Sequence, residues 1–131
     1  MRDYSSFGLS KARIDKAKTC LKAAYLNIEN DLFADSANRS YYCIFHSMRA
    51  VLALENVDFK KHSSVIAYFN QHYLKTEKLP KAFSKIISKA FDIRNDSDYE
   101  DFYIVSKEEV EEQANNAKMF LEAVEEYIDS V

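Results

Sequence analysis

Helical periodicity dominates this chain, and it is the feature that most restricts how the chain can fold. Apolar residues recur at steps of three and four over four long stretches, the spacing of one face of an α-helix. One Gly and one Pro among 131 residues leave few residues for tight β-hairpins or Gly-rich phosphate loops. We therefore predict an all-α, up-and-down bundle of four long helices and one short helix, a single domain over residues 1–131.

The apolar stripes also set the extent of each helix. They predict helices over residues 10–30, 35–55, 62–74, 80–94 and 106–131. Asp35 suits the N-cap of the second helix, and Pro80, which has no N–H to satisfy, suits the first turn of the fourth. Ser106 and Glu109 have the spacing of a capping box, so the last helix is the best defined. The pattern fails across residues 95–104, where we predict a loop that can include some helix.

Charge is distributed unevenly along the sequence. The formal net charge is -3, yet residues 62–94 carry six Lys or Arg against two acids, and residues 95–131 carry two against twelve. This asymmetry predicts one basic and one acidic face. A basic face can bind phosphate even on an acidic protein, or it can be an ordinary solvated surface.

The cysteines and histidines lack the spacing of a metal site or a nucleophilic triad. Cys20 and Cys43 lie within apolar stripes, and we expect buried free thiols in a reducing compartment. His46, His62 and His72 are scattered, so we expect no metal and no cofactor. Without a membrane-length apolar stretch or an apolar leader, we expect a soluble, cytoplasmic protein with no membrane partner.

Two features stand apart from the core pattern. A second line on the helix over 35–55 is polar, aromatic and basic at once; it consists of Arg39, Tyr42, His46 and Arg49. Arg94 continues an apolar line on the fourth helix, where it can bind a ligand or pair with Asp96 or Asp98. Plainer roles for the others are packing with a satisfied hydroxyl for Tyr41 and Tyr42, a satisfied interior position for His46, and a backbone hydrogen bond for His62.

Three short motifs, in a fixed order, carry a resemblance to a known family. Residues 38–52 read NRSYYCIFHSMRAVL, residues 61–66 read KHSSVI with Phe69 following, and residues 94–99 read RNDSDY. This order closely resembles the HEPN superfamily, in its small stand-alone branch with an Arg-x-x-x-Asp-Tyr motif, across nearly the whole chain. The resemblance implies an all-α homodimer in which Arg94 faces a cleft at the dimer interface.

The resemblance also implies a class of activity. Many relatives are metal-independent endoribonucleases, often toxins paired with a nucleotidyltransferase antitoxin, and others are binding domains. Catalytic relatives use an Arg, four to six residues and then a His; Arg94 and Asn95 match, but position 99 is Tyr. RNA cleavage needs a base, an acid and positive charge. Arg94 can supply the charge and Tyr99 a proton, and His46 or His62 can act as base if the fold brings either close.

These observations lead to one expected function and its alternatives. We expect a component of a toxin–antitoxin or defence module that binds RNA or a nucleotide at a dimer cleft through Arg94, Arg39, Tyr42 and Arg49. Binding is favoured over catalysis because Tyr99 replaces the motif His. One alternative is an endoribonuclease that uses Arg94, Asn95 and Tyr99 with His46 or His62. Another is a non-catalytic partner of a nucleotidyltransferase, modified on Tyr99 or Tyr103, and the plainest is a structural dimeric scaffold.

Overall fold

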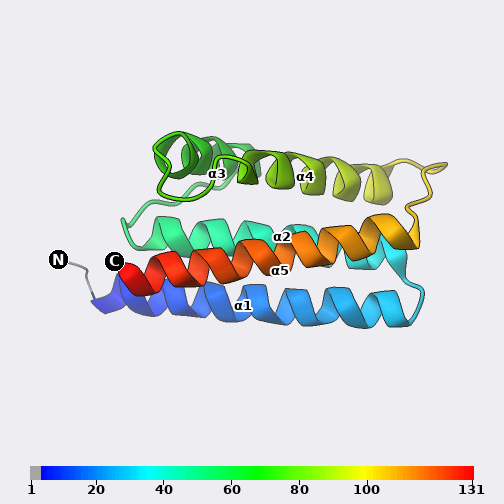
Figure 1. Ribbon diagram of the computed structural model, residues 1–131, viewed down its shortest axis with the longest axis horizontal. Helices are drawn as coiled ribbons and strands as arrows, with labels where there is room; N and C mark the ends of the chain where they lie inside the picture. The colour runs from blue at the N-terminus through cyan, green and yellow to red at the C-terminus, as the bar shows by residue number, and fades with distance from the viewer. Residues whose placement is uncertain (1–3) are drawn as a thin grey trace.

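Helices account for the regular structure of residues 4–131, the part of the chain that the computed structural model describes. They are α1 (Tyr4–Glu29), α2 (Phe33–Ala53), α3 (His62–Phe69), a π-helical turn η1 (Asn70–Leu74), α4 (Phe83–Tyr99) and α5 (Lys107–Ser130). The predicted all-α bundle of four long helices and one short helix is confirmed. Helices α1, α2 and α5 lie side by side, and α3 and α4 form a further layer against α2 (Figure 1).

Helix α2 is central because it packs against α1, α3, α4 and α5. Its sequence fits this position, because most of its residues are apolar side chains or small serines that are buried. Burying a hydroxyl is costly unless it has a partner. Ser36 Oγ donates to the Ala24 carbonyl at 2.9 Å, and Ser47 Oγ donates to the Cys43 carbonyl at 2.7 Å. Small side chains with internal partners thus let α1 and its neighbours approach α2 closely.

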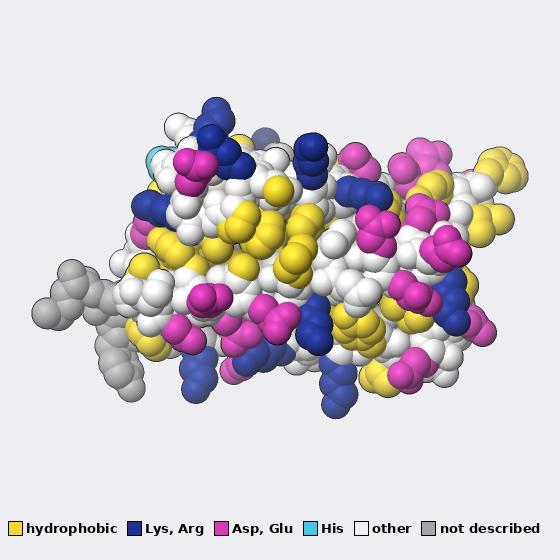
Figure 2. All heavy atoms as spheres, viewed as in Figure 1, with side chains coloured by type: hydrophobic (Ala, Val, Ile, Leu, Met, Phe, Trp, Pro, Cys, Tyr) yellow, Lys and Arg dark blue, Asp and Glu magenta, His cyan; other side chains and the backbone are white. Residues whose placement is uncertain are grey.

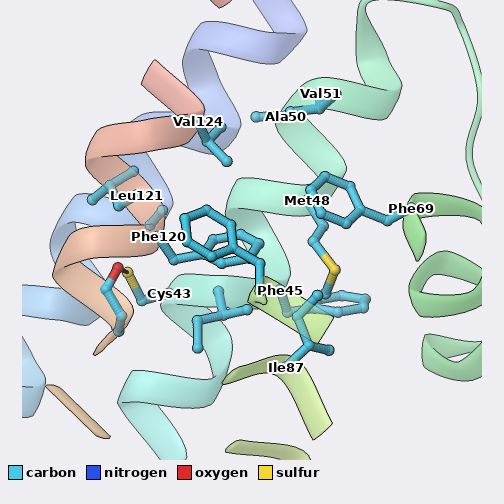
Figure 3. Packing of buried hydrophobic residues seen from close by; sticks show 14 of the residues in the cluster. Cys43, Phe45, Met48, Ala50, Val51, Phe69, Ile87, Phe120, Leu121 and Val124 are labelled. Atoms are coloured by element: carbon cyan, nitrogen blue, oxygen red, sulfur yellow. Dashed lines mark hydrogen bonds between the residues drawn. The ribbon is translucent and has the colours of Figure 1, made fainter. Parts of the chain in front are cut away.

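Aromatic rings fill the space between α2, α5 and the α3–α4 layer (Figure 3). The Phe120 ring of α5 lies 5.7 Å from the Phe69 ring and 5.0 Å from the Phe83 ring, centroid to centroid. The apolar stripe of α5, hereafter the α5 seam, runs in steps of three and four from residue 110 and packs against α2 and α1. Its buried members are Val110, Ala114, Ala117, Leu121, Val124 and Ile128. Val131 is 60% exposed and does not belong to that seam.

Several predicted helix ends are wrong. Helix α1 begins at Tyr4 rather than near residue 10. The N-cap of α2 is Leu32, without a side-chain cap, and Asp35 lies in the first turn, where a carboxylate interacts favourably with the helix dipole. Pro80 precedes α4 in a turn, in which its carbonyl accepts from the Phe83 N–H.

The outer surface follows the charge pattern of the sequence. In Figure 2, dark blue Lys and Arg side chains stand over the α3–α4 layer, and magenta Asp and Glu side chains gather along α5 and near the α4–α5 connection. The capping box of Ser106 and Glu109 begins α5 as predicted. Within residues 4–131, no helix is both long enough and apolar enough to span a bilayer.

Candidate functional site

Arg94 lies near the end of α4 and is held by side chains of its own chain. Its Nε lies 3.2 Å from Asp98 Oδ2 in an i,i+4 ion pair, although the N–H is not aligned for a hydrogen bond. Its Nη1 donates to Asn95 Oδ1 at 3.1 Å, and its Nη2 donates to the Tyr42 hydroxyl at 3.2 Å. The alternative role of Arg94, pairing with Asp98, is thus present. The side chain as a whole keeps 15% exposure, while its Nε is buried.

These contacts explain why α4 extends past the predicted end. Residues 95–99 contain Asn, Asp and Ser, which compete with helix through local side-chain hydrogen bonds. The Arg94–Asp98 pair supports the last turn, and Asn38 Nδ2 of α2 donates to Asp98 Oδ2 at 3.1 Å. Tertiary contacts therefore overcome the local preference over residues 95–99, and the segment 95–104 is part helix and part loop, as the prediction allowed.

Tyrosine rings surround the Arg94 guanidinium. Its central carbon lies 5.2 Å from the Tyr41 ring, 5.5 Å from the Tyr42 ring and 5.9 Å from the Tyr99 ring. Such distances allow cation–π attraction. Tyr41 is fully buried, whereas Tyr99 is 72% exposed. The expected packing role of Tyr41 and Tyr42, with satisfied hydroxyls, is confirmed, and Tyr99 adds an exposed aromatic face beside the guanidinium.

A second guanidinium meets the same cluster. The Arg39 central carbon lies 5.2 Å from the Tyr42 ring, and Arg39 Nε donates to Asn38 Oδ1 at 3.1 Å. Two arginines therefore contact one ring. Asp98 pairs directly with Arg94 and is linked to Arg39 through Asn38. Like charges held on one ring repel, and a bound anion relieves that repulsion. The excess positive charge makes the cluster, hereafter the Arg94 cluster (Arg39, Tyr41, Tyr42, Arg94 and Tyr99), suited to phosphate.

His62 lies next to the Arg94 cluster. Its Nδ1 is 2.9 Å from the Tyr41 hydroxyl, and its ring centroid is 4.0 Å from that of Phe45. Burial raises the pKa of Tyr41 to about 12, so the phenol stays protonated. Burial, followed by the charges of Arg94 and Arg49, lowers the pKa of His62. A neutral imidazole at this place can accept a proton. The hydrogen-bond partner of His62 is the Tyr41 side chain, not the backbone group expected for its plainer role.

His46 lies one turn after Tyr42 on α2. Its ring lies 5.9 Å from that of Tyr42, and its Nδ1 is buried without a hydrogen-bond partner among residues 4–131, so the expected satisfied interior role is wrong at that atom. Its pKa is lowered to about 4, first by burial and then by four neighbouring cations: Lys16, Arg49, Arg39 and Arg13. Arg94 is absent from that set, so of the two histidines His62 is the one placed to act with Arg94.

Other predicted site residues have structural partners. Arg49 makes a bidentate contact with Asp58, Nε to Oδ1 at 3.2 Å and Nη2 to Oδ2 at 2.8 Å, and Arg13 Nη2 reaches the same carboxylate at 3.0 Å. These contacts hold Asp58, in the α2–α3 connection, against α1 and α2. The Tyr103 hydroxyl donates to Glu109 Oε2 at 3.2 Å. The structure thus gathers Arg39, Tyr42, Arg94, Asn95 and Tyr99, and it leaves Arg49 and Tyr103 outside that group.

Two members of the site were missed in the sequence. Asn38 orients both Arg39 and Asp98, and Tyr41 links Arg94 to His62. Asn38 is four residues before Tyr42, which places both on one face of the helix, and this spacing could have identified Asn38 as a site residue. Tyr41 belongs to the apolar stripe, and no local pattern distinguishes it from a core residue.

Comparison with known proteins agrees with the motifs. The sequence model of the HEPN domain matches residues 10–127. A "UPF0332 protein" of Thermotoga maritima is 33% identical over 116 residues, 88% of this chain and 88% of that protein. Two proteins of Methanocaldococcus jannaschii carry the names "Putative toxin MJ0605" and "Putative toxin MJ0142". The first is 31% identical over 92% of this chain and 90% of its own length, and the second is 32% identical over 89% and 80%.

Proposed function

This chain belongs to the HEPN domain family, and we propose that it is the component of a toxin–antitoxin or defence-type module that binds RNA or a nucleotide. Two relatives named as toxins support a toxin-like HEPN module. The observation that carries the binding proposal is the pair of guanidiniums, Arg39 and Arg94, on the single ring of Tyr42. Fixed guanidiniums recognise phosphate through paired hydrogen bonds, and exposed rings stack on bases.

The proposed site lies at the interface of a homodimer. Arg94 Nη groups bind a phosphate oxygen, and the exposed ring of Tyr99 stacks on the adjoining base. Asp98 competes for Arg94, but its side chain is 28% exposed and can turn toward water when phosphate arrives. A second subunit doubles the positive charge around the cleft, which strengthens attraction for a polyanion.

RNA binding is tested by the fluorescence anisotropy of a labelled single-stranded oligouridylate. We expect Arg94→Ala to weaken binding about tenfold or more, because a charge-assisted contact is lost. Arg94→Lys keeps the charge but not the planar fork, so its affinity should fall between those of wild type and Arg94→Ala. Lys85→Ala, which removes an exposed cation from the same helix, is the control. Equal affinities for wild type and Arg94→Ala would reject the site.

RNA cleavage is the second candidate, favoured by the contact that Arg94 and His62 both make with Tyr41. In this scheme His62 donates its Nδ1–H to the Tyr41 hydroxyl, and this tautomer leaves Nε2 free to accept the proton of the 2′-hydroxyl. The 2′-oxygen attacks phosphorus, Tyr99 gives a proton to the leaving 5′-oxygen, and Arg94 stabilises the charge on the phosphorane. RNA incubated with the protein in EDTA should then be cut by wild type and spared by His62→Ala and Arg94→Ala. The same background in all three samples would remove the catalytic candidate and leave binding.

Modification by a nucleotidyltransferase is the third candidate, and the structure favours Tyr99 over Tyr103 for it. Tyr99 is 72% exposed, whereas the Tyr103 hydroxyl is bonded to Glu109. Incubation with ATP and a nucleotidyltransferase from the same locus should add one nucleotidyl mass to wild type and none to Tyr99→Phe. An unchanged mass of wild type, with an enzyme shown to be active, contradicts this route.

A further inference from the structure

A separate hollow opens beside the Arg94 cluster, where α2 ends and α3 begins. Its volume is about 360 Å³, and its lining residues come from α2, from the α2–α3 connection and from the start of α3: Phe45, Arg49, Asp58, Phe59, Lys60 and His62. Three of its lining residues, Phe45, Arg49 and His62, lie in the sequence motifs, whereas the other three lie outside them. The hollow shares one wall with the Arg94 cluster, because His62 contacts Tyr41.

Positive charge prevails around this hollow. Its carboxylate, Asp58, already accepts from Arg13, from Arg49 and from the backbone N–H of Phe59. These contacts satisfy the carboxylate and hold its pKa below the usual range, with the Arg49 hydrogen bond as the largest cause. Two cations, Arg49 and Lys60, line the hollow with this one carboxylate, and Arg13 pairs with the same carboxylate from outside the lining. An excess of cationic donors in a concave site attracts an anion with several acceptor oxygens.

The His62 imidazole, which lines this hollow, can donate a hydrogen bond through one ring nitrogen. The Tyr41 hydroxyl lies 2.9 Å from His62 Nδ1, and the direction of this hydrogen bond depends on the imidazole tautomer. For this hollow we assign the tautomer in which the hydroxyl donates to Nδ1 and the imidazole proton is on Nε2. Burial and neighbouring Arg94 lower the pKa of His62, which favours the neutral ring. Tyr41 is therefore a positioning residue: it fixes the tautomer in which the ring presents Nε2–H away from Tyr41.

An aromatic face lies on the rim. Phe59 is 38% exposed, and its ring lies 5.6 Å from that of Tyr68. Rings at this exposure supply stacking surfaces for bases without sequence preference. The hollow thus combines cations, one fixed N–H donor and an aromatic edge, the elements that bind single-stranded nucleic acid.

We propose that this hollow is a second phosphate subsite for single-stranded RNA, in which Lys60 and Arg49 bind the phosphate and His62 Nε2–H donates to it. The inference rests on the proposed function, because one strand occupies both this subsite and the Arg94 cluster. Arg94 and His62 pack on the same Tyr41 ring, the first with its central carbon 5.2 Å from the ring centroid and the second with ring centroids 5.9 Å apart. Because both groups pack on this one ring, we place neighbouring phosphates of one strand on them.

Two adjacent lysines provide a matched test of the subsite. Lys60 lines the hollow, and Lys61, the N-cap residue of α3, does not. In the oligouridylate assay we expect Lys60→Ala to weaken binding about fivefold to tenfold and to lower the salt slope by about 1. Lys61→Ala should change affinity less than about twofold. If both variants lose affinity equally while Arg94→Ala abolishes binding, the hollow is rejected and the proposed function stands.

A phosphate titration tests the hollow without RNA. The imidazole proton signals of the wild type are followed by NMR as inorganic phosphate replaces chloride at constant ionic strength and pH, with His62→Gln assigning the signal. We expect a saturable shift of the His62 signal and none for His72, which lies outside the hollow. The absence of a His62 shift overturns the subsite. A saturable shift in a protein that does not bind oligouridylate overturns both the proposed function and the assignment to an RNA strand.

Discussion

Protonation of His46 should control much of the acid sensitivity of this fold. Burial, aided by Lys16 and three arginines, lowers its pKa to about 4, against about 6.5 in an unfolded chain. As the pH falls through this interval, the unfolded chain binds a proton that the folded chain does not. The stabilising contribution is therefore complete above about pH 6.5 and is lost progressively as the pH falls toward about 4.

The magnitude follows from the separation of the two pKa values. Such a site loses about 2 kcal/mol of unfolding free energy between about pH 7.5 and about pH 5. His46 is only half-buried, so water screens the neighbouring cations. We halve the figure for this screening and expect about 1 kcal/mol.

Urea denaturation of wild type and His46→Gln at the two pH values measures this contribution. Gln keeps a polar side chain at the position but does not titrate in this range, so other titrating groups contribute equally to both proteins. We expect wild type to lose about 1 kcal/mol more than His46→Gln on acidification. Parallel losses in the two proteins would refute the argument that burial and the neighbouring cations keep His46 neutral.

Three further predictions concern packing, capping and thiol reactivity. Phe120→Ala should lower the free energy of unfolding by about 3–5 kcal/mol in urea denaturation, because it empties the space between the Phe69 and Phe83 rings. Ser106→Ala removes half of the capping box and should cost about 1 kcal/mol by the same measurement, with Ser130→Ala as a neutral control. Cys43 is fully buried and burial raises its pKa to about 12, so a thiol reagent should label it only as the chain unfolds; rapid labelling of native protein would contradict its position.

Features that depend on near neighbours in the chain could be predicted from the sequence. The capping box of Ser106 and the α5 seam were both found, because each depends on residues three or four positions apart. The line of Arg39, Tyr42, His46 and Arg49 was found for the same reason, and all four side chains are half-buried on α2. The two cysteines are buried free thiols, as their places in apolar stripes indicate.

Helix ends were less predictable because neighbours in space compete with local preference. Asp35 has the chemistry of an N-cap, but α2 begins two residues earlier, at Phe33. Residues 95–99 have turn-forming side chains. Asp98 nevertheless pairs with Arg94 and accepts a hydrogen bond from Asn38, and these contacts keep residues 95–99 helical. A local pattern states what a segment prefers alone, and a few charge-assisted contacts are enough to reverse a weak preference.

The amino-acid sequence by itself determined the helical architecture and the family, since periodicity, caps and ordered motifs are written along the chain. Only the tertiary structure decided which chemical groups meet. Tyr42 and Arg94 are 52 residues apart, and Tyr41 and His62 are 21 apart, yet both pairs are in hydrogen-bond contact. Helix propensity and capping act within about one turn, whereas these contacts depend on how α2, α3 and α4 pack, and that packing follows from burial of the whole core.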